Sequence, residues 1–212
     1  MAVHDTVENG RAAFTRRTLE SLSETVDWKK HRLFITDNDS CKETKTLLNS
    51  DCFGLRFHPI ALPRNIGTAE ALNLAWEHRL PGEHCIKIDN DVVIHQSGWV
   101  EQMEEAIQRD RSIGQVGLKR KDCIESPQRD MNDWYHSELV MLPHEPGQRW
   151  IVVEEANHIM GTCVMHSSAL LDKVGYLKQP GLYGFDDCFM SLRSQIAGFK
   201  NVFLPHIDID HI

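Results

Sequence analysis

Short apolar runs alternate along this chain with longer stretches whose apolar residues recur every three or four positions. The short runs are typical of buried strands, and the longer stretches are typical of amphipathic helices. Strands that alternate with helices predict an α/β fold whose central sheet is mainly parallel and carries helices on both faces. The expected strands are residues 1–6, 31–36, 55–62, 85–88, 115–119, 150–153, 158–165 and 201–205. The expected helices are residues 12–25, a helix capped by Ser40 that runs through residues 47–48, and residues 69–78, 98–109, 167–174 and 186–197.

One of these expected strands ends in two carboxylates. The apolar run at residues 85–88 is followed by Asp89, Asn90 and Asp91, and then by more apolar residues. In open α/β sheets, ligands bind at the carboxyl ends of the strands. Carboxylates at that position suit Mg²⁺ or Mn²⁺ carrying a diphosphate, because these cations take carboxylate and phosphate oxygens. The same spacing recurs twice elsewhere in the chain, and Asp and Asn favour turns, so a plain turn is the alternative.

Size and charge narrow the class of protein. A chain of 212 residues with 41% hydrophobic residues suffices for one sizeable core, so we expect a single domain over residues 1–212. The formal net charge is −8, from 31 acidic residues against 23 Lys and Arg, and no segment concentrates the bases. This balance argues against a broad face for a nucleic-acid backbone.

The cysteines, the apolar runs and the N-terminal residues bear on location. No two of the six cysteines form a Cys-x-x-Cys pair, and a disulfide framework is unusual in a domain of this size, so we expect reduced cysteines in or near the core. No apolar run approaches the ~18 residues of a membrane span. The start of the chain lacks the basic-then-apolar profile of a secretory signal. These features predict a cytoplasmic protein without an integral membrane segment.

Two further segments carry residue types suited to a nucleotide. Asp37 follows the expected strand at residues 31–36, where a carboxylate can accept a hydrogen bond from a base or a ribose, or can cap the next helix. Arg64, Asn65 and Gly67 precede another expected helix. A glycine there lets the backbone come close to a ligand, and an arginine supplies a cation for phosphate. An ordinary capped helix is the alternative.

Two acids and a histidine lie near the end of the sequence. Asp186 and Asp187 begin the last expected helix, where the helix macrodipole favours acids whatever their function. A carboxylate kept ionised there also suits a general base that takes a hydroxyl proton. His211 can offer an imidazole ligand to a cation held by Asp91, although any one histidine among 12 is more often a surface or packed residue.

Residues 120–150 interrupt the alternation of strands and helices. They are polar, contain three prolines, and include Trp134 and Tyr135. Long loops of this kind in compact domains often form lids or binding loops, whereas a surface excursion with its aromatic residues packed down is the alternative. Aromatic faces stack on sugar rings or bases, so we expect both aromatic residues to face an acceptor.

Taken in order along nearly the whole chain, these segments resemble the inverting family 2 glycosyltransferases with the GT-A fold. Phe189 stands where many members carry another acid, and Asp186 is one methylene shorter than the glutamate of the family. The similar segments are residues 33–40 to the nucleotide-contacting strand end, 65–73 to the Asn-x-Gly segment, 87–92 to the DxD motif, 161–175 to the approach to the acceptor site, and 186–193 to the Glu-Asp…Leu-Arg motif.

The resemblance implies a role for each candidate residue. Asp91 and His211 would hold Mn²⁺ or Mg²⁺. Asp187 would be the catalytic base, and Asp186 would be the second catalytic acid of the pair. Residues 1–119 would form the nucleotide-sugar-binding part, and residues 120–212 the acceptor-binding part with the catalytic acids. The implied nucleotide-sugar contacts are Thr6, Asp37, Arg64, Asn65, Gly67, Asp89 and Asn90, and the acceptor contacts are Trp134 and Tyr135.

The activity implied is metal-dependent, inverting transfer of a sugar from a nucleotide-diphosphate donor, with a UDP-sugar favoured, to an acceptor hydroxyl. A glycan, a lipid-linked sugar, a protein and a modified nucleobase carrying a hydroxyl are all compatible acceptors, because loop shape decides the acceptor. A nucleotidyltransferase is one alternative, although the sequence lacks an evident glycine- and arginine-rich phosphate loop near its start. A non-catalytic module that binds a nucleotide sugar is the other.

Overall fold

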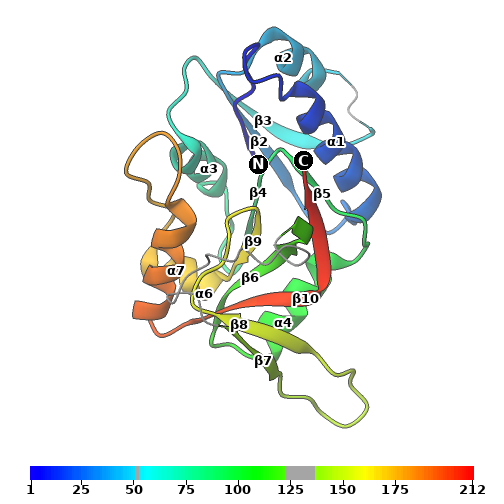
Figure 1. Cartoon of the computed structure of the whole chain (residues 1–212), viewed down its shortest axis with the longest axis vertical. Coiled ribbons are helices and arrows are strands. Elements are labelled where there is room, and N and C mark those ends of the chain that lie inside the picture. The colour runs from blue at the N-terminus through cyan, green and yellow to red at the C-terminus, as the bar shows by residue number, and fades with distance from the viewer. Residues whose placement is uncertain (51–52, 123–136) are drawn as a thin grey trace.

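A computed structural model describes residues 1–50, 53–122 and 137–212 of the chain. Strands and helices alternate through the first half, as expected (Figure 1). The strands are β1 (Ala2–Val3), β2 (Leu33–Asn38), β3 (Phe57–Leu62), β4 (Cys85–Ile88), β5 (Val92–Val93), β6 (Ile113–Arg120), β7 (Ser137–Met141), β8 (Val152–Ala156), β9 (Cys163–His166) and β10 (Lys200–His211). The helices are α1 (Ala12–Thr25), α2 (Lys42–Leu48), α3 (Thr68–Trp76), α4 (Trp99–Arg109), α6 (Ser168–Val174) and α7 (Asp186–Ile196).

The strands form two sheets that differ in direction. In the first sheet β1, β2 and β3 run parallel, as predicted. The second sheet has the order β4-β9-β6-β10-β8-β7, and β5 also pairs with β10. Among the described residues, β6 and β10 are the only parallel neighbours in it. The expectation of a mainly parallel sheet is therefore wrong for this second sheet. Residues 137–166 hold no helix, so the chain reverses there without the crossover that parallel neighbours require.

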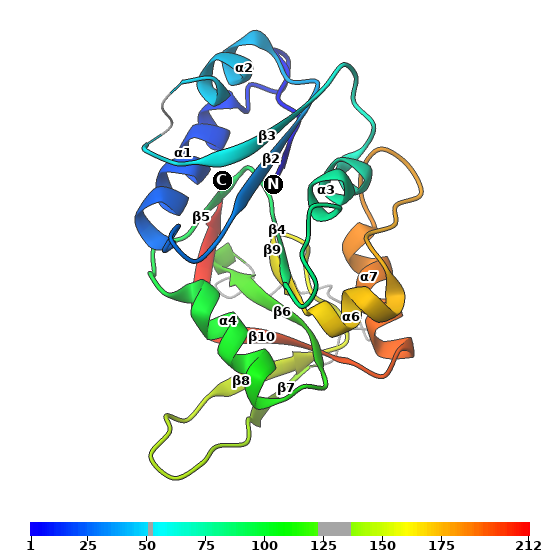
Figure 2. The ribbon, with the colours of Figure 1, turned by 180° about the vertical axis from the view of Figure 1, so that it is seen from behind.

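Helices cover both faces of the sheets, so the predicted α/β class is confirmed (Figures 1 and 2). Successive residues of a strand point to opposite faces. Leu33 and Ile35 of β2 join the core that includes residues of α1, α2 and α4, whereas Phe34, between them, packs against the core built by α3, α6 and α7. Within the described ranges, every helix is too short or too polar to cross a membrane.

The last strand, β10, pairs first with β6 and then with β5. It runs parallel to β6, its register shifts between Leu204 and Asp208, and the parallel pairing then resumes with Asp208 opposite Lys119. Pro205 lies within this irregular segment, where proline is tolerated because a ladder hydrogen bond is already missing. Beyond the shift β10 pairs antiparallel with β5, and His211 lies opposite Val92. The bend of β10 therefore carries His211 to the residues that follow β4.

Candidate active site

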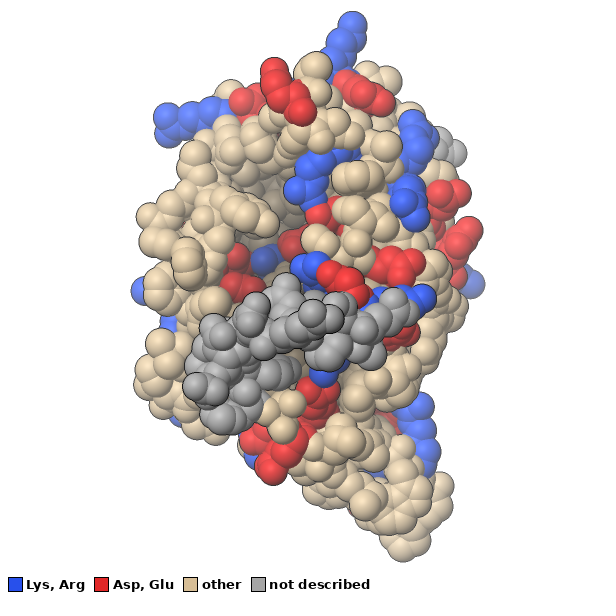
Figure 3. Space-filling view, in the orientation of Figure 1, with Lys and Arg blue, Asp and Glu red and all other residues tan. Residues whose placement is uncertain are grey.

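The carboxyl end of β4 is the centre of the candidate site. Asp89, Asn90 and Asp91 connect β4 to β5, and the backbone N–H of Asp89 donates to the carbonyl oxygen of Thr162 at 2.9 Å. Figure 3 shows acidic and basic side chains close together at a hollow near the middle of this face. The position agrees with the rule that ligands bind at the carboxyl ends of strands.

Asp91 is the most buried carboxylate of this segment. Its side chain is 6% exposed, and its Oδ2 lies 3.3 Å from Nε2 of His211. The backbone N–H of Ile212 also donates to the carbonyl oxygen of Asp91 at 3.0 Å. The pairing of β10 with β5 thus brings together the two residues that the sequence proposes as metal ligands.

The surroundings of Asp91 fit a divalent cation. Within the described part of the chain, the buried Oδ1 of Asp91 has no hydrogen-bond partner. A buried oxygen without a partner is costly, and a bound cation would satisfy it. Burial, together with the charge of Arg120, lowers the pKa of His211, which favours the neutral imidazole that ligates metals. The guanidinium of Arg11 contacts Oδ2 of Asp91, so an arriving cation must share or displace it.

Asn90 points away from this metal position into a buried polar cluster. Its Nδ2 donates to Oδ1 of Asp5 at 2.8 Å and to Oγ1 of Thr15 at 2.7 Å. The fully buried Asp5 also accepts from Oγ1 of Thr15 at 2.6 Å and from Oγ1 of Thr44 at 2.8 Å. Asn90 therefore anchors the β4–β5 turn to the first sheet, a role that its place in the DxD motif does not reveal.

A buried lysine joins the two acidic motifs. Nζ of Lys87, on β4, lies 2.6 Å from Oδ2 of Asp186 and 3.8 Å from Oδ1 of Asp89. Burial alone would lower the pKa of Lys87, but the carboxylates of Asp89 and Asp186 raise it above its ordinary value. Desolvation by the surrounding protein raises the pKa of Asp89, although a third of its side chain is accessible. Asp186 is thereby held in an ion pair.

Asp187 is the more accessible acid of its pair. Its side chain is 27% exposed, and it accepts hydrogen bonds from the backbone N–H groups of Gly161 at 3.1 Å and Cys188 at 2.8 Å. Nε2 of His158 lies 3.8 Å from its Oδ2. A Cβ at Gly161 would lie 2.5 Å from Nζ of Lys87 and 3.1 Å from Cβ of Asp187, so a side chain here would force the amino group of Lys87 to move. The carboxylate is thus oriented by two backbone donors and remains open to solvent.

The proposed nucleotide contacts Asp37 and Asn65 make local hydrogen bonds. Oδ1 of Asp37 accepts from the N–H of Ser40 at 2.8 Å, in the turn that precedes α2. The N-cap of α2 is Cys41, which has no side-chain cap hydrogen bond, so Asp37 does not cap this helix. Nδ2 of Asn38 donates to Oδ1 of Asn65 at 2.9 Å, and Oδ1 of Asn38 accepts from the N–H of Ile66 at 2.9 Å. The end of β2 therefore holds the Asn-x-Gly segment in place.

Gly67 approaches the chain's own backbone in this structure. Its φ is +98°, and a Cβ there would lie 3.2 Å from Cα of Leu182. The N–H of Thr68 donates to the carbonyl oxygen of Leu182 at 3.1 Å, and the N–H of Ala69 donates to Oε1 of Gln179 at 2.8 Å. The close backbone approach that the sequence offers to a ligand at Gly67 is thus made here to the segment that precedes Asp186.

The remaining predicted contacts are peripheral or outside the described residues. Arg64 is exposed, so its guanidinium is accessible to a ligand. Oγ1 of Thr6 accepts from the N–H of Asn9 at 3.1 Å in a turn after β1. Trp134 and Tyr135, the proposed acceptor contacts, lie outside the described residues.

Lys87, Arg11 and Asp5 belong to the site region but were missed from the sequence. Lys87 interrupts an apolar strand, and a lysine in a buried strand is a signal that an acidic partner faces it. Asp5 lies two residues after β1, just as Asp37 and Asp89 lie at or next to the ends of their strands, so its position carried a signal as well. Arg11 carries none, because its contact with Asp91 depends on how α1 packs.

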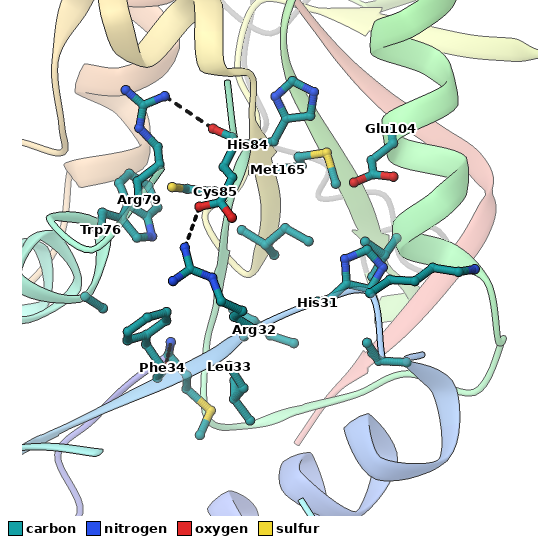
Figure 4. A pocket seen from close by; sticks show the side chains of 18 of the residues that line it. His31, Arg32, Leu33, Phe34, Trp76, Arg79, His84, Cys85, Glu104 and Met165 are labelled. Atoms are coloured by element: carbon teal, nitrogen blue, oxygen red, sulfur yellow. Dashed lines mark hydrogen bonds and ion pairs between the residues drawn. The ribbon is translucent and has the colours of Figure 1, made fainter. Parts of the chain in front are cut away.

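A separate cavity of about 430 Å³ lies at the amino ends of β2 and β4 (Figure 4). Arg32, Trp76 and His84 contribute to its lining, and none of the predicted site residues does. Two charged groups at its edge are paired, since Nη2 of Arg32 lies 2.5 Å from Oε2 of Glu83. The cavity is therefore distinct from the acidic cluster at the carboxyl ends of the strands.

Comparison with solved structures gives the fold a name. The chain superposes on a mannosyltransferase from Pyrobaculum calidifontis, solved with GDP-Man and Mn²⁺, with a TM-score of 0.70 and 16% identity over 99% of this chain and 55% of that one. It also resembles GalNAc-T7 with UDP, GalNAc and Mn²⁺ (TM-score 0.68, 14% identity, 100% and 42% covered) and S. aureus TarS 1–349 (TM-score 0.67, 14% identity, 98% and 57% covered). The chain thus spans about half the length of these proteins, and the likeness establishes the GT-A fold.

The family follows from the sequence match. No curated protein matches the chain. The family model described as glycosyl transferase family 2 matches residues 7–174, which is more than half of the chain. This match favours a glycosyltransferase over the nucleotidyltransferase and over the non-catalytic binding module. With its GT-A fold and this match, the chain belongs to glycosyl transferase family 2 and is a glycosyltransferase.

Proposed function

We propose that this enzyme transfers a sugar from a nucleotide-diphosphate donor to an acceptor hydroxyl with inversion at the anomeric carbon and with the help of a divalent cation. The observation that carries the proposal is the position of Lys87, which lies 2.6 Å from Asp186 and 3.8 Å from Asp89. One buried cation thus ties the end of β4 to the acids of α7. Donor and acceptor must meet between these two motifs, so their proximity is what a transfer reaction needs.

Asp91 and His211 are the proposed ligands for Mn²⁺ or Mg²⁺. The buried Oδ1 of Asp91, without a partner in the described part of the chain, supports this role, as does the imidazole 3.3 Å from Oδ2. When bound, the cation would neutralise the diphosphate of the donor and stabilise the charge of the departing nucleotide. Arg11 contacts the same carboxylate and is placed to exchange Asp91 for a diphosphate oxygen.

Asp187 is the proposed general base. Its partly exposed carboxylate is oriented by the N–H groups of Gly161 and Cys188, and an ionised carboxylate so held can take the acceptor hydroxyl proton at an oxygen. Asp186 is less suited to this step, because its carboxylate is 8% exposed and paired with Lys87. Attack by the deprotonated hydroxyl on the face opposite the leaving group inverts the anomeric carbon.

The donor contacts proposed from the sequence divide into two groups. Arg64 and Asp89 are accessible and remain direct candidates for the diphosphate and the sugar. The hydrogen bonds of Asn90, Asn65 and Asp37 within the protein support an indirect role in shaping the loops of the donor site. The remaining donor candidates, Thr6 and Gly67, stay predictions, as do the acceptor contacts Trp134 and Tyr135 and the assignment of residues 120–212 to the acceptor-binding part.

A UDP-sugar is the favoured donor. Of the three similar structures, GalNAc-T7 was solved with UDP, and TarS has also been solved with UDP-GlcNAc. The mannosyltransferase instead carries GDP-Man.

The state of the described cysteines bears on location. Four of them are unpaired, namely Cys41, Cys85, Cys163 and Cys188, which supports the predicted cytoplasmic location.

A thermal-shift panel of UDP-, GDP- and dTDP-sugars, each with and without Mn²⁺, tests the proposal. A ligand that binds only the folded state stabilises it by about 2.7 kcal/mol at one hundred times its dissociation constant, so the donor should raise the melting temperature only when Mn²⁺ is present. Slow hydrolysis of that donor should follow. Equal melting temperatures across the whole panel, with the protein folded throughout, would contradict the proposal.

A further inference from the structure

A histidine, an aspartate and a cysteine meet at the start of α7. His158 comes from the segment between β8 and β9, whereas Asp187 and Cys188 lie in the first turn of the helix. One ligand atom from each of the three side chains lies within 4.8 Å of the other two, and Nε2 of His158 is 3.8 Å from Oδ2 of Asp187. The three residues are separated into two parts of the sequence, so the tertiary fold builds this cluster.

The donor atoms are an imidazole nitrogen, a carboxylate oxygen and a thiol sulfur. This mixture matches the ligands of Zn²⁺, which binds Cys, His and Asp at tetrahedral sites. Mg²⁺ and Mn²⁺ prefer oxygen ligands and gain little from a thiolate. We propose that His158, Asp187 and Cys188 form a Zn²⁺ site that is separate from the Asp91 and His211 position.

The cluster is partly organised for a metal. The N–H groups of Gly161 and Cys188 fix the Asp187 carboxylate, whose Oδ2 faces the imidazole of His158. Burial lowers the pKa of His158, so the ring is neutral near pH 7 and can offer a lone pair. Burial and the nearby Asp187 raise the pKa of the Cys188 thiol to about 11, so zinc binding must release the thiol proton to solvent.

Three protein ligands leave one tetrahedral position of the Zn²⁺ ion for water. Because Asp187 is one of the three ligands, the zinc would bind to the proposed catalytic base. The inference of a regulatory effect rests on the proposed function. A carboxylate that ligates Zn²⁺ cannot also accept the acceptor proton, so zinc should inhibit transfer. The Asp91 position is made by different residues, so Mn²⁺-dependent donor binding should persist when zinc occupies the cluster.

Cobalt titration of the whole chain tests the site without any assay of activity. Co²⁺ replaces Zn²⁺ at such sites, and a thiolate ligand produces a near-ultraviolet charge-transfer band. The wild-type protein should develop this band, and Zn²⁺ should bleach it. The band should disappear in Cys188→Ser and weaken in His158→Gln, while it persists in Cys41→Ser, the matched control with a half-buried thiol outside the cluster.

Two results of the cobalt titration would contradict the proposed Zn²⁺ site. The first is Co²⁺ binding without a thiolate band, and the second is a band of full intensity in Cys188→Ser. Circular dichroism of each variant verifies that it is folded.

An activity measurement then separates the two proposals. Zn²⁺ should reduce donor turnover by at least about tenfold in the wild-type enzyme, and the ratio of rates with and without Zn²⁺ should approach one in Cys188→Ser. If the cobalt band forms and turnover is unaffected by Zn²⁺, the metal site stands and the assignment of Asp187 as base fails. If turnover needs Asp187 and no cobalt band forms, the base stands and the site fails.

Discussion

Nζ of Lys87 lies 2.6 Å from Oδ2 of Asp186, and this ion pair joins β4 to α7 across 99 positions of sequence. Both side chains are nearly buried, at 6% and 8% exposure. A lysine on a strand that is otherwise apolar is stable there because two carboxylates compensate its charge. The amino group of Lys87 therefore helps to fix the relative position of the two acidic motifs.

Replacing Lys87 with Met should destabilise the fold by about 3–5 kcal/mol, because it leaves the Asp186 carboxylate buried without a counter-ion. Urea unfolding measures the change. Lys200→Met is the matched control, since this lysine is 39% exposed and its pair with Glu155 should contribute less than about 1 kcal/mol. The double variant Lys87→Met, Asp186→Asn should recover part of the loss. If Lys87→Met is as stable as the wild type, the ion pair between Lys87 and Asp186 does not stabilise the fold.

Replacing Asp91 with Asn should nearly abolish Mn²⁺-dependent binding of UDP, because the cation loses its charged ligand and the diphosphate keeps its charge. Calorimetric titration of UDP with Mn²⁺ measures this. Asp210→Asn is the control, since Asp210 has the same spacing from Asp208 but pairs with Nε2 of His95 at 2.8 Å. If Asp91→Asn binds UDP as tightly as the wild type in the presence of Mn²⁺, Asp91 is not the metal ligand.

Replacing Asp187 with Asn should lower transfer by roughly 10²-fold or more while donor affinity is kept, because the amide cannot accept the proton. Asp186→Asn should act differently: its main effect should be on stability and acceptor binding, since it breaks the pair with Lys87. Single-turnover rates with the donor found in the thermal-shift panel distinguish the two variants. Near-normal transfer by folded Asp187→Asn would exclude this residue as the base.

His166 should make the protein sensitive to acid. It is 2% exposed, and burial, assisted by Lys87, lowers its pKa from 6.5 to about 3. Below pH 6.5 the unfolded chain takes up a proton that the folded chain refuses, so stability is complete above that pH. It should fall by about 1.4 kcal/mol per pH unit as the pH decreases toward 3.

The measurement is urea unfolding at neutral pH and at about pH 5. His166→Gln should flatten the difference between the two conditions, because glutamine does not titrate. His95→Gln, a change at an exposed histidine, should leave the acid sensitivity as it is. If the free energy of unfolding falls equally between the two pH values in the wild type and in His166→Gln, other groups cause the sensitivity to acid.

The sequence was informative where local pattern decides structure. The strand at residues 85–88 matches β4, and the helix that begins at Asp186 matches α7, because each has the periodicity of its element. His211, which the sequence proposes as a ligand beside Asp91, does lie 3.3 Å from it, although the metal role of both residues stays a prediction. These features depend on short segments and on the order of motifs.

Other relationships depend on packing between distant residues and were not predicted. The contact of Arg11 with Asp91 requires α1 to dock at a particular angle, and the cluster around Asp5 joins residues of α1, α2 and the β4–β5 turn. Strand direction in the second sheet was also missed, because an apolar run of a few residues looks the same in a parallel and in an antiparallel neighbour.

The backbone contact between Gly67 and Leu182 has a consequence for inhibitors. Because the amides of Thr68 and Ala69 donate to Leu182 and Gln179, these two donors at the start of α3 are not available to a phosphate. If the donor is a nucleotide diphosphate, its charge should then depend mainly on the cation and on arginine side chains such as Arg64 and Arg11. Mimics of the donor that replace the diphosphate with a group unable to chelate Mn²⁺ should therefore lose most of their affinity, whereas a chelating substitute should retain it even without the sugar.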